Sequence, residues 1–436
     1  MRKVAFITSA VLLAAALSCN SDASRNGIAS RQLHYVTPGN AGFDERSIEN
    51  LDSLFNEYIA KEAIASAEVM VVRNGGIAYH KSFSPEGAVD GQDSIFRIMS
   101  MTKAITSVAA MMLYEQGKFL LDDPLENYLP EFANMQVLQS VNPSDTSFTA
   151  IPARRKITVR DLLRHTSGLA YSFTSPDLQM IYQKAGVVEA IPSGTEVRTL
   201  ADNMKLLGSL PLLHEPGEYY TYGVSTDVLG YLVEVVSGQR FDEYLMEQIF
   251  EPLGMGDSYF FVPGNKSARL AKGFSNTTEE PLVKMDGPRE IIEYHTKTNE
   301  KFFSGGAGLC TTAADYAKFL QMLLNRGTYN GARVLGPKTV NLMVTDQMAG
   351  IGPQEGGGPG DREFKFGLGF QLGTESSYRK KPGSLQRYSW GGALGTTYWW
   401  DTENQLAVVG MIQMLPFFHN DMWKKMEVII YGALDN

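Results

Sequence analysis

Strand-forming and helix-forming segments are separated along this chain of 436 residues. Residues 66–83 predict two strands joined at Asn74-Gly75-Gly76, a typical hairpin turn. Three further strand patterns stand near the C-terminus, at residues 366–372, 388–401 and 405–414. Between about residues 120 and 300, helical patterns alternate with loops rich in Pro and Gly. The order predicts one sheet built from the two ends of the chain.

The expected fold class is therefore α/β (α+β), with an antiparallel sheet flanked by helices and an inserted, mostly helical subdomain. The strands are expected to be antiparallel because they come as hairpins. We place the α/β part at about residues 37–98 and 300–436, and the helical part at about 99–299, within a single folded domain from 37 to 436.

The first 19 residues have the order of an export signal. Arg2 and Lys3 precede an apolar run that ends in Ala16-Leu17-Ser18-Cys19. This ending resembles the lipobox of bacterial lipoproteins, although Ala16 stands where leucine is usual. We expect lipidation at Cys19, a flexible tether over residues 20–36, and a membrane-anchored lipoprotein that faces the periplasm or cell exterior. A plain secretory signal with an incidental cysteine is the alternative.

Charge and cysteine content limit the possible partners. The net charge is −9 and no basic run stands out, which argues against nucleic acid. Cys19 and Cys310 are the two cysteines, so neither a disulfide framework nor a cysteine-based zinc site is expected. The six histidines show no H-E-x-x-H or H-x-H spacing, so we expect neither a catalytic metal nor another cofactor.

Ser100-Met101-Thr102-Lys103 opens an apolar helical run. A nucleophilic serine needs a base, because a free hydroxyl ionises far above neutral pH. Residues three apart on a helix face the same way, so Lys103 can reach the Ser100 hydroxyl. Burial in the apolar run favours a neutral amine that accepts a proton. The alternative is a helix-capping serine followed by a lysine that extends to solvent.

Two later segments supply further candidates. Tyr222 lies between Pro216-Gly217 and an apolar helical pattern, where a phenol can act as a base or proton relay. Gly391 and Gly392 lie in a strand pattern and indicate close approach to the backbone, as an oxyanion hole requires. The alternatives are a packing tyrosine and a β-bulge.

Together these segments resemble the serine β-lactamase superfamily, in particular its class C-like branch of β-lactamases, D-alanyl-D-alanine carboxypeptidases and esterases. The resemblance covers about residues 42–432 and implies a β-lactamase/penicillin-binding-protein-like fold. It implies that Ser100 is the acylated nucleophile, that Lys103 is its base, and that Tyr222 is the tyrosine of the Y-x-N motif. Trp390-Gly391-Gly392 falls where the family has K-T-G or H-x-G. The expected oxyanion donors are the backbone N–H groups of Ser100 and Ala393.

Two positions depart from the family pattern. Val224 replaces the asparagine of Y-x-N, and Trp390 replaces the lysine of K-T-G. In lactam-active members these two side chains help to hold the substrate's acylamino group and carboxylate. Valine cannot hydrogen-bond through its side chain, and the indole offers one donor without positive charge. Similar W-G-G sequences occur among the esterases.

We therefore expect Val224, Trp390, Gly391 and Gly392 to contact the substrate, with Tyr398 and Trp399 beside them. Such a pocket suits an uncharged or apolar acyl group. The predicted function is an exported serine hydrolase with carboxylesterase-type activity on a small ester or amide. β-Lactamase or D-Ala-D-Ala carboxypeptidase activity is the alternative, followed by a non-catalytic binding protein of the same fold. The Gly-rich stretch Glu355–Asp361 is interpreted as a loop that covers the site.

Overall fold

The computed structural model describes residues 32–85, 91–192, 198–276, 282–285, 294–296, 301–353 and 363–435. The signal segment with Cys19, most of the tether, and the stretch Glu355–Asp361 lie outside these residues. Within the described ranges, no helix is both long enough and apolar enough to cross a membrane.

The central sheet has seven strands in the order β1-β3-β2-β15-β14-β13-β12. Their bounds are β1 His34–Tyr35, β2 Ala67–Arg73, β3 Gly76–Phe83, β12 Gln371–Leu372, β13 Arg387–Gly391, β14 Thr397–Asp401 and β15 Leu406–Met411. β1 runs parallel to β3, and every other neighbouring pair in this sheet is antiparallel. The prediction of a sheet built from both ends of the chain is confirmed, and β15 pairs with β2 at the join.

Alternating side chains along the strands give the sheet two apolar faces. In β2, Val69 and Val71 face the core formed with the N- and C-terminal helices, whereas Met70 and Val72 face the main core. All four are at most 1% exposed. Covering both faces of the sheet by helices allows a nearly continuous apolar strand to be buried.

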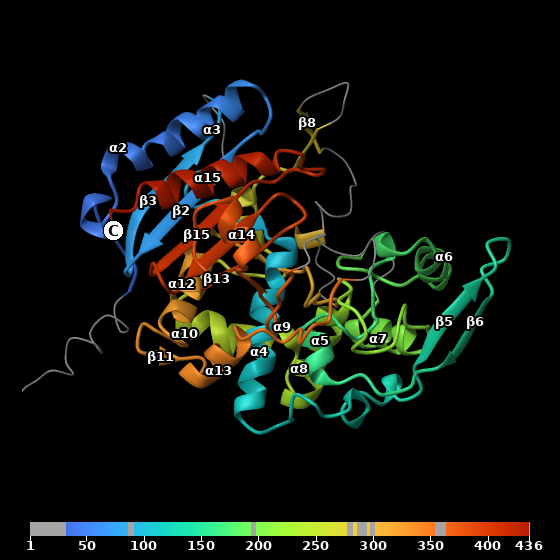
Figure 1. Cartoon of the computed structure of the whole chain (residues 1–436). Coiled ribbons are helices and arrows are strands. Elements are labelled where there is room, and N and C mark those ends of the chain that lie inside the picture. The colour runs from blue at the N-terminus through green and yellow to red at the C-terminus, as the bar shows by residue number, and fades with distance from the viewer. Residues whose placement is uncertain are drawn as a thin grey trace, which may run out of the picture.

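Helices α3 and α15 lie together over one face of the sheet, and α12 packs on the other (Figure 1). The helices are α2 Glu45–Ile48, α3 Asn50–Ala60, α4 Thr102–Glu115, α5 Val159–Leu163, α6 Pro176–Ala185, α7 Leu200–Gly208, α8 Ser225–Ser237, α9 Phe241–Leu245, α10 Glu251–Leu253, α12 Ala313–Leu324, α13 Pro337–Met343, α14 Glu375–Lys380 and α15 Asn420–Gly432. Thr312 caps α12 by accepting a hydrogen bond from the Asp315 N–H.

The middle of the chain is mostly helical, as expected, but it also contains a hairpin, β5 Gln136–Val141 and β6 Phe148–Pro152. The sequence did not predict this hairpin because its strands lack apolar alternation and are largely exposed. Short ladders β4 Phe96–Arg97 with β9 Cys310–Thr311, β7 Phe274–Ser275 with β8 Val283–Lys284, and β10 Thr328–Tyr329 with β11 Ala332–Arg333 complete the strands.

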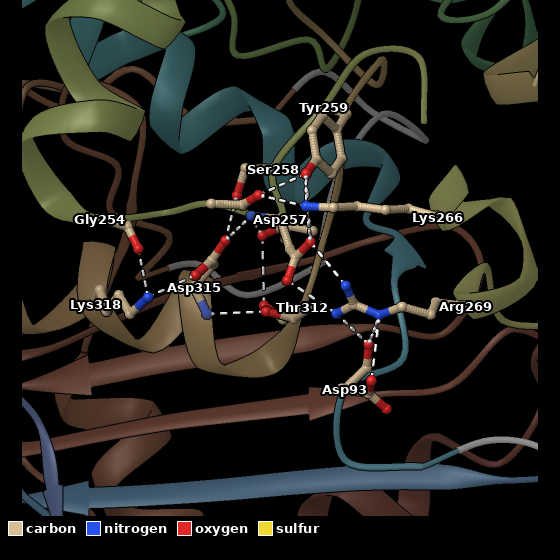
Figure 2. Close-up of polar contacts among 12 residues, drawn as sticks. Asp93, Gly254, Asp257, Ser258, Tyr259, Lys266, Arg269, Thr312, Asp315 and Lys318 are labelled. Atoms are coloured by element: carbon tan, nitrogen blue, oxygen red, sulfur yellow. Dashed lines mark hydrogen bonds and ion pairs between the residues drawn. The ribbon is translucent and has the colours of Figure 1, made fainter. Parts of the chain in front are cut away.

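A cluster of charged side chains joins three distant segments (Figure 2). Arg269 forms two hydrogen bonds of 2.9 Å with the Asp257 carboxylate and an ion pair of 3.3 Å with Asp93. Lys266 lies 2.8 Å from the same Asp257 carboxylate, and Asp315 on α12 accepts from the Asp257 N–H at 2.7 Å. The segment after α10 is thereby held against α12 and against the chain that leads into β4.

Candidate active site

Met99, the residue before Ser100, has a backbone conformation that is unusual for methionine. β4 pairs with β9 and is followed by a short 3-10 turn, Met99–Met101, and by helix α4. Met99 has a φ of 47°, in the left-handed region where residues other than glycine are strained by about 1 kcal/mol or more. The strained turn places Ser100 at the cavity described below while α4 stays buried.

Lys103 lies beneath Ser100 and is 3% exposed. Its Nζ has three hydrogen-bond partners: Ser100 Oγ at 3.2 Å, the Tyr171 hydroxyl at 3.1 Å and the Gly306 carbonyl at 2.7 Å. A lysine that extends to solvent is therefore the wrong interpretation. Among the described residues, the Ser100 side chain also makes no helix-capping hydrogen bond.

A buried carboxylate holds the turn that faces Lys103. Asp227 Oδ1 accepts from Ser304 Oγ at 2.5 Å and from the Gly306 N–H at 3.1 Å. Its Oδ2 has no hydrogen-bond partner among the described residues. Burial raises the pKa of Asp227, although Lys103 and the two donors oppose this shift. Asp227 thus fixes the Gly306 peptide whose carbonyl oxygen accepts from Lys103.

Tyr222 lies just before α8 and is surrounded by aromatic rings. Its ring centroid is 5.1 Å from that of His165, 5.3 Å from that of Tyr171 and 5.4 Å from that of Trp390. Lys103 Nζ is 4.8 Å from the Tyr222 ring centroid, and the indole of Trp390 donates to the Tyr222 hydroxyl at 3.4 Å. The phenol is therefore held between the lysine and β13.

Gly391, the last residue of β13, and Gly392, which follows the strand, make different contacts. Gly391 pairs with Thr397 of β14 without a register shift, so the β-bulge alternative is wrong. A Cβ on Gly392 would lie 2.4 Å from the carbonyl oxygen of Ile98, two residues before Ser100. Close approach to the backbone is thus confirmed, and the approaching group is the segment that carries Ser100. The N–H of Ala393 donates to none of the described residues.

One cavity of about 580 Å³ collects most of the predicted site residues. It is lined by Ser100, Tyr222, Trp390, Gly391, Gly392 and Ala393, together with residues of β12, β13 and α15. Phe417 and Trp423 add apolar surface to the cavity. The structure therefore brings Ser100 together with residues as far along the chain as Trp423, 323 positions later.

Three predicted contacts are not made. Val224 is fully buried in the main core and does not line the cavity, because it precedes α8 with its side chain turned inward. Tyr398 and Trp399 are 0% and 1% exposed and pack into opposite faces of the sheet. These are corrections to the predicted pocket. A strand position near the site does not make a side chain face the cavity, because neighbours alternate between faces.

Sequence reasoning missed three polar side chains around Lys103. Tyr171 and Asp227 are described above, and His165 packs its ring against Tyr222. Burial and the nearby Lys103 lower the pKa of His165 to about 3, so this imidazole is neutral at neutral pH and a weak base. Asp227 follows Tyr222 by five residues in a predicted apolar helix, which is the signal that would have singled it out.

Known proteins place the chain in a family. The model of the Beta-lactamase family matches residues 51–427. "Protein Rv1367c" of Mycobacterium tuberculosis is 36% identical over 74% of this chain and 79% of that protein. An Escherichia coli K12 protein provisionally named a D-alanyl-D-alanine carboxypeptidase is 25% identical over 90% of this chain and 87% of its own length. Esterase EstB of Burkholderia gladioli is 27% identical over 82% of this chain and 88% of its own.

A solved structure agrees with these sequence matches. EstCE1, described as a hydrolase with promiscuous acyltransferase activity, superposes with a TM-score of 0.73 over 89% of this chain and 99% of its own, at 23% identity. This likeness confirms the expected fold. Because the family model spans most of the sequence, the chain belongs to the Beta-lactamase family and is a serine hydrolase.

Proposed function

We propose that the protein is a carboxylesterase that works through an acyl-enzyme on Ser100. The observation that carries the proposal is the hydrogen bond from Lys103 Nζ to Ser100 Oγ at the cavity wall. A buried lysine in direct contact with a serine hydroxyl is the arrangement that activates a nucleophile. The relatives named as esterases, among them EstB, support the choice of an ester substrate.

The proposed steps begin at the contact between Lys103 and Ser100, and the other groups line the same cavity. Ser100 Oγ attacks the ester carbonyl carbon, and its proton passes to Lys103 Nζ. The tetrahedral oxyanion accepts hydrogen bonds from the backbone N–H groups of Ser100 and Ala393. Tyr222 then delivers a proton to the departing alkoxide, and the carbonyl re-forms as the acyl-enzyme. Water attacks this ester and gives a proton to Tyr222, which has lost its own. Lys103 returns its proton to the departing Ser100 Oγ, and the acid is released.

The wall of the cavity favours esters over lactams. Trp390 places an indole, and not an ammonium, beside Tyr222. Removal of a charge-assisted contact weakens binding by about one to two orders of magnitude. Val224 is turned into the core, so position 224 supplies no side-chain hydrogen bond to a substrate. The E. coli relative named as a carboxypeptidase is the observation that keeps peptidase or lactamase activity as the second candidate.

One parallel assay separates the candidates. Purified protein is given p-nitrophenyl butyrate, the chromogenic cephalosporin nitrocefin and a D-Ala-D-Ala peptide at equal concentration. We expect kcat/KM for the ester to exceed both others by at least about tenfold, given the lost charged contact. Greater turnover of nitrocefin or of the peptide would overturn the ester proposal. Val224→Asn should leave the ranking unchanged, because that side chain lies in the core.

We also propose export and lipidation, on the sequence of the first 19 residues alone. Full-length protein expressed in a bacterium should partition with the membrane fraction, and Cys19→Ala should move it to the soluble extract. Cys310→Ala, which removes the buried cysteine, is the matched control and should leave the partition unchanged. Equal partition of the Cys19→Ala variant and the parent protein would contradict lipidation.

A further inference from the structure

The cavity that holds Ser100 continues along β13, away from the glycines. Arg387, Ser389 and Gly391 are two residues apart on this strand, so their side chains share one face, and all three line the cavity. Residues four apart on a strand are separated by about 13 Å. The cavity therefore has room for a substrate that is extended between Gly391 and Arg387.

The two charged side chains that line this cavity, Lys381 and Arg387, are both cations. Behind them lies Glu427 of α15, whose side chain is 4% exposed. Lys381 Nζ is 2.5 Å from one Glu427 oxygen, and Arg387 Nε is 2.9 Å from the other. The side chains of Lys381 and Arg387 are 31% and 17% exposed. Two cationic side chains are thus partly exposed to the cavity, whereas the carboxylate that pairs with both of them is buried.

Arg387 is held in place by contacts that leave part of its guanidinium unused. Its Nη1 donates to Ser389 Oγ at 2.9 Å, and its guanidinium carbon lies 5.1 Å from the ring centroid of Trp399. Its Nη2 has no hydrogen-bond partner among the described residues. The nearby buried Asp401 accepts from Tyr431 and from Asn404. A pre-positioned guanidinium with free N–H groups is suited to a carboxylate.

We propose that Lys381 and Arg387 form a subsite for a carboxylate at the far end of the substrate, carried by the acyl chain or by the alcohol. The proposal rests on the ester hydrolysis proposed above. A positive charge stands three residues before Trp390, at Arg387, on the opposite face of the same strand. The part of the substrate next to Ser100 meets aromatic rings, and the remote end meets two cations. The natural substrates are then long-chain esters with one anionic end.

Matched ester pairs test this subsite. The first pair is p-nitrophenyl hydrogen suberate and its methyl ester, with the charge on the acyl chain. The second is 8-acetoxyoctanoate and its methyl ester, with the charge on the alcohol. We expect the parent protein to favour the charged member of at least one pair by about tenfold in kcat/KM, the effect of a charge-assisted contact. The pair that shows the preference identifies the part of the substrate that reaches Arg387.

The ratio of kcat/KM for the charged ester to kcat/KM for its methyl ester does not depend on the fraction of active protein. It can therefore also be measured for a destabilised variant. Arg387→Gln and Lys381→Gln should each bring the ratio close to one, whereas Arg387→Lys should keep part of the preference. Lys424→Gln is the control, because Lys424 lies on α15 but does not line this cavity. Raised salt should also reduce the preference in the parent protein, since these cations are partly exposed.

Failure of the subsite and failure of the esterase proposal give different results. Turnover of the methyl esters without any preference for the charged members overturns the subsite and leaves the esterase standing. Absence of turnover for all four esters overturns the esterase. Methyl hydrogen suberate is then used to protect Ser100 from a fluorophosphonate. Equal protection in the parent protein and in Arg387→Gln would overturn the subsite as well.

Discussion

At the scale of single residues, the site depends on the three hydrogen-bond acceptors of the Lys103 Nζ group. Ser100, Tyr171 and Gly306 each accept one, so a protonated Lys103 is fully hydrogen-bonded. Loss of its proton frees Lys103 to accept from Ser100. Burial, followed by the nearby Tyr222 and Asp227, raises the pKa of Tyr171, which therefore stays a neutral phenol. Tyr171 positions the lysine, and the proposed proton relay is left to Tyr222.

Tyr171→Phe and Tyr222→Phe should consequently differ in how far they reduce kcat. Removal of the Tyr171 hydroxyl deletes one neutral contact of Lys103, so we expect kcat for p-nitrophenyl butyrate to fall about tenfold or less, with no change in the shape of the pH–rate profile. Removal of the Tyr222 hydroxyl deletes an acid–base group, so kcat should fall about 100-fold or more. Equal losses, or a larger loss for Tyr171→Phe, would assign the relay to Tyr171.

At the scale of secondary-structure elements, β13 is docked on the segment that carries Ser100. The contact needs a glycine at 392, because a Cβ there would meet the Ile98 carbonyl at 2.4 Å and Thr396 Oγ1 at 2.3 Å. A backbone carbonyl two residues before Ser100 cannot move without moving the nucleophile. The W-G-G sequence thus sets a distance between two elements in addition to lining the cavity.

Gly392→Ala should therefore fold but lose activity. We expect the rate of Ser100 labelling by a fluorophosphonate to fall about 100-fold, the loss typical of an ångström-scale misplacement. Gly432→Ala at the end of α15 is the control, because a Cβ there meets nothing within 4 Å. Labelling of Gly392→Ala at the parent rate, with an unchanged melting temperature, would show that the contact does not position Ser100.

Local patterns predicted the elements well where an apolar period was strong. The hairpin at Asn74-Gly75-Gly76 and the cap at Thr312 follow from short-range rules. The helical spacing of apolar residues continues across Glu49, where the structure divides the segment into α2 and α3. Periodicity alone could not reveal this break.

At the scale of the whole molecule, the site is assembled from segments separated by most of the chain. Sequence reasoning predicted Ser100 and Tyr222, which line the cavity, because each sits in a recognisable local motif. It missed Tyr171 and Arg387, whose importance depends on tertiary contacts that no local pattern encodes. It also missed Asp227, although a carboxylate within an apolar helical pattern was a usable signal. It also misplaced Val224, since burial of a loop residue is decided by packing.

The charged cluster around Asp257 joins three segments that are distant in the sequence (Figure 2), so its loss should lower the stability of the whole fold. We expect Asp257→Asn to reduce the free energy of unfolding by about 1–2 kcal/mol at pH 7. Glu243→Gln, which affects an exposed pair at 3.7 Å with Arg240, should change it by less than about 0.5 kcal/mol. Urea unfolding measures both; similar values for the two variants would contradict a structural role for the cluster.

The stabilisation by Asp257 should also depend on pH. Burial raises the pKa of Asp257, but the contacts with Arg269 and Lys266 outweigh this and hold the pKa below its usual 3.8. A carboxyl whose pKa is lower in the folded state stabilises the fold fully above the unfolded value and loses this effect as the pH falls through the folded value. The difference between the parent protein and Asp257→Asn should therefore persist at pH 6 and shrink below pH 3.8.

In the proposed reaction, an ester substrate acylates Ser100 with Lys103 as its base. Intact-mass spectrometry of protein quenched during turnover of p-nitrophenyl butyrate detects this acylation. We predict a single added butyryl group that maps to Ser100, no adduct in Ser100→Ala, and adduct formation at least about 100-fold slower in Lys103→Ala. Turnover without a covalent adduct in the parent protein, or an adduct that persists in Ser100→Ala, would contradict the account.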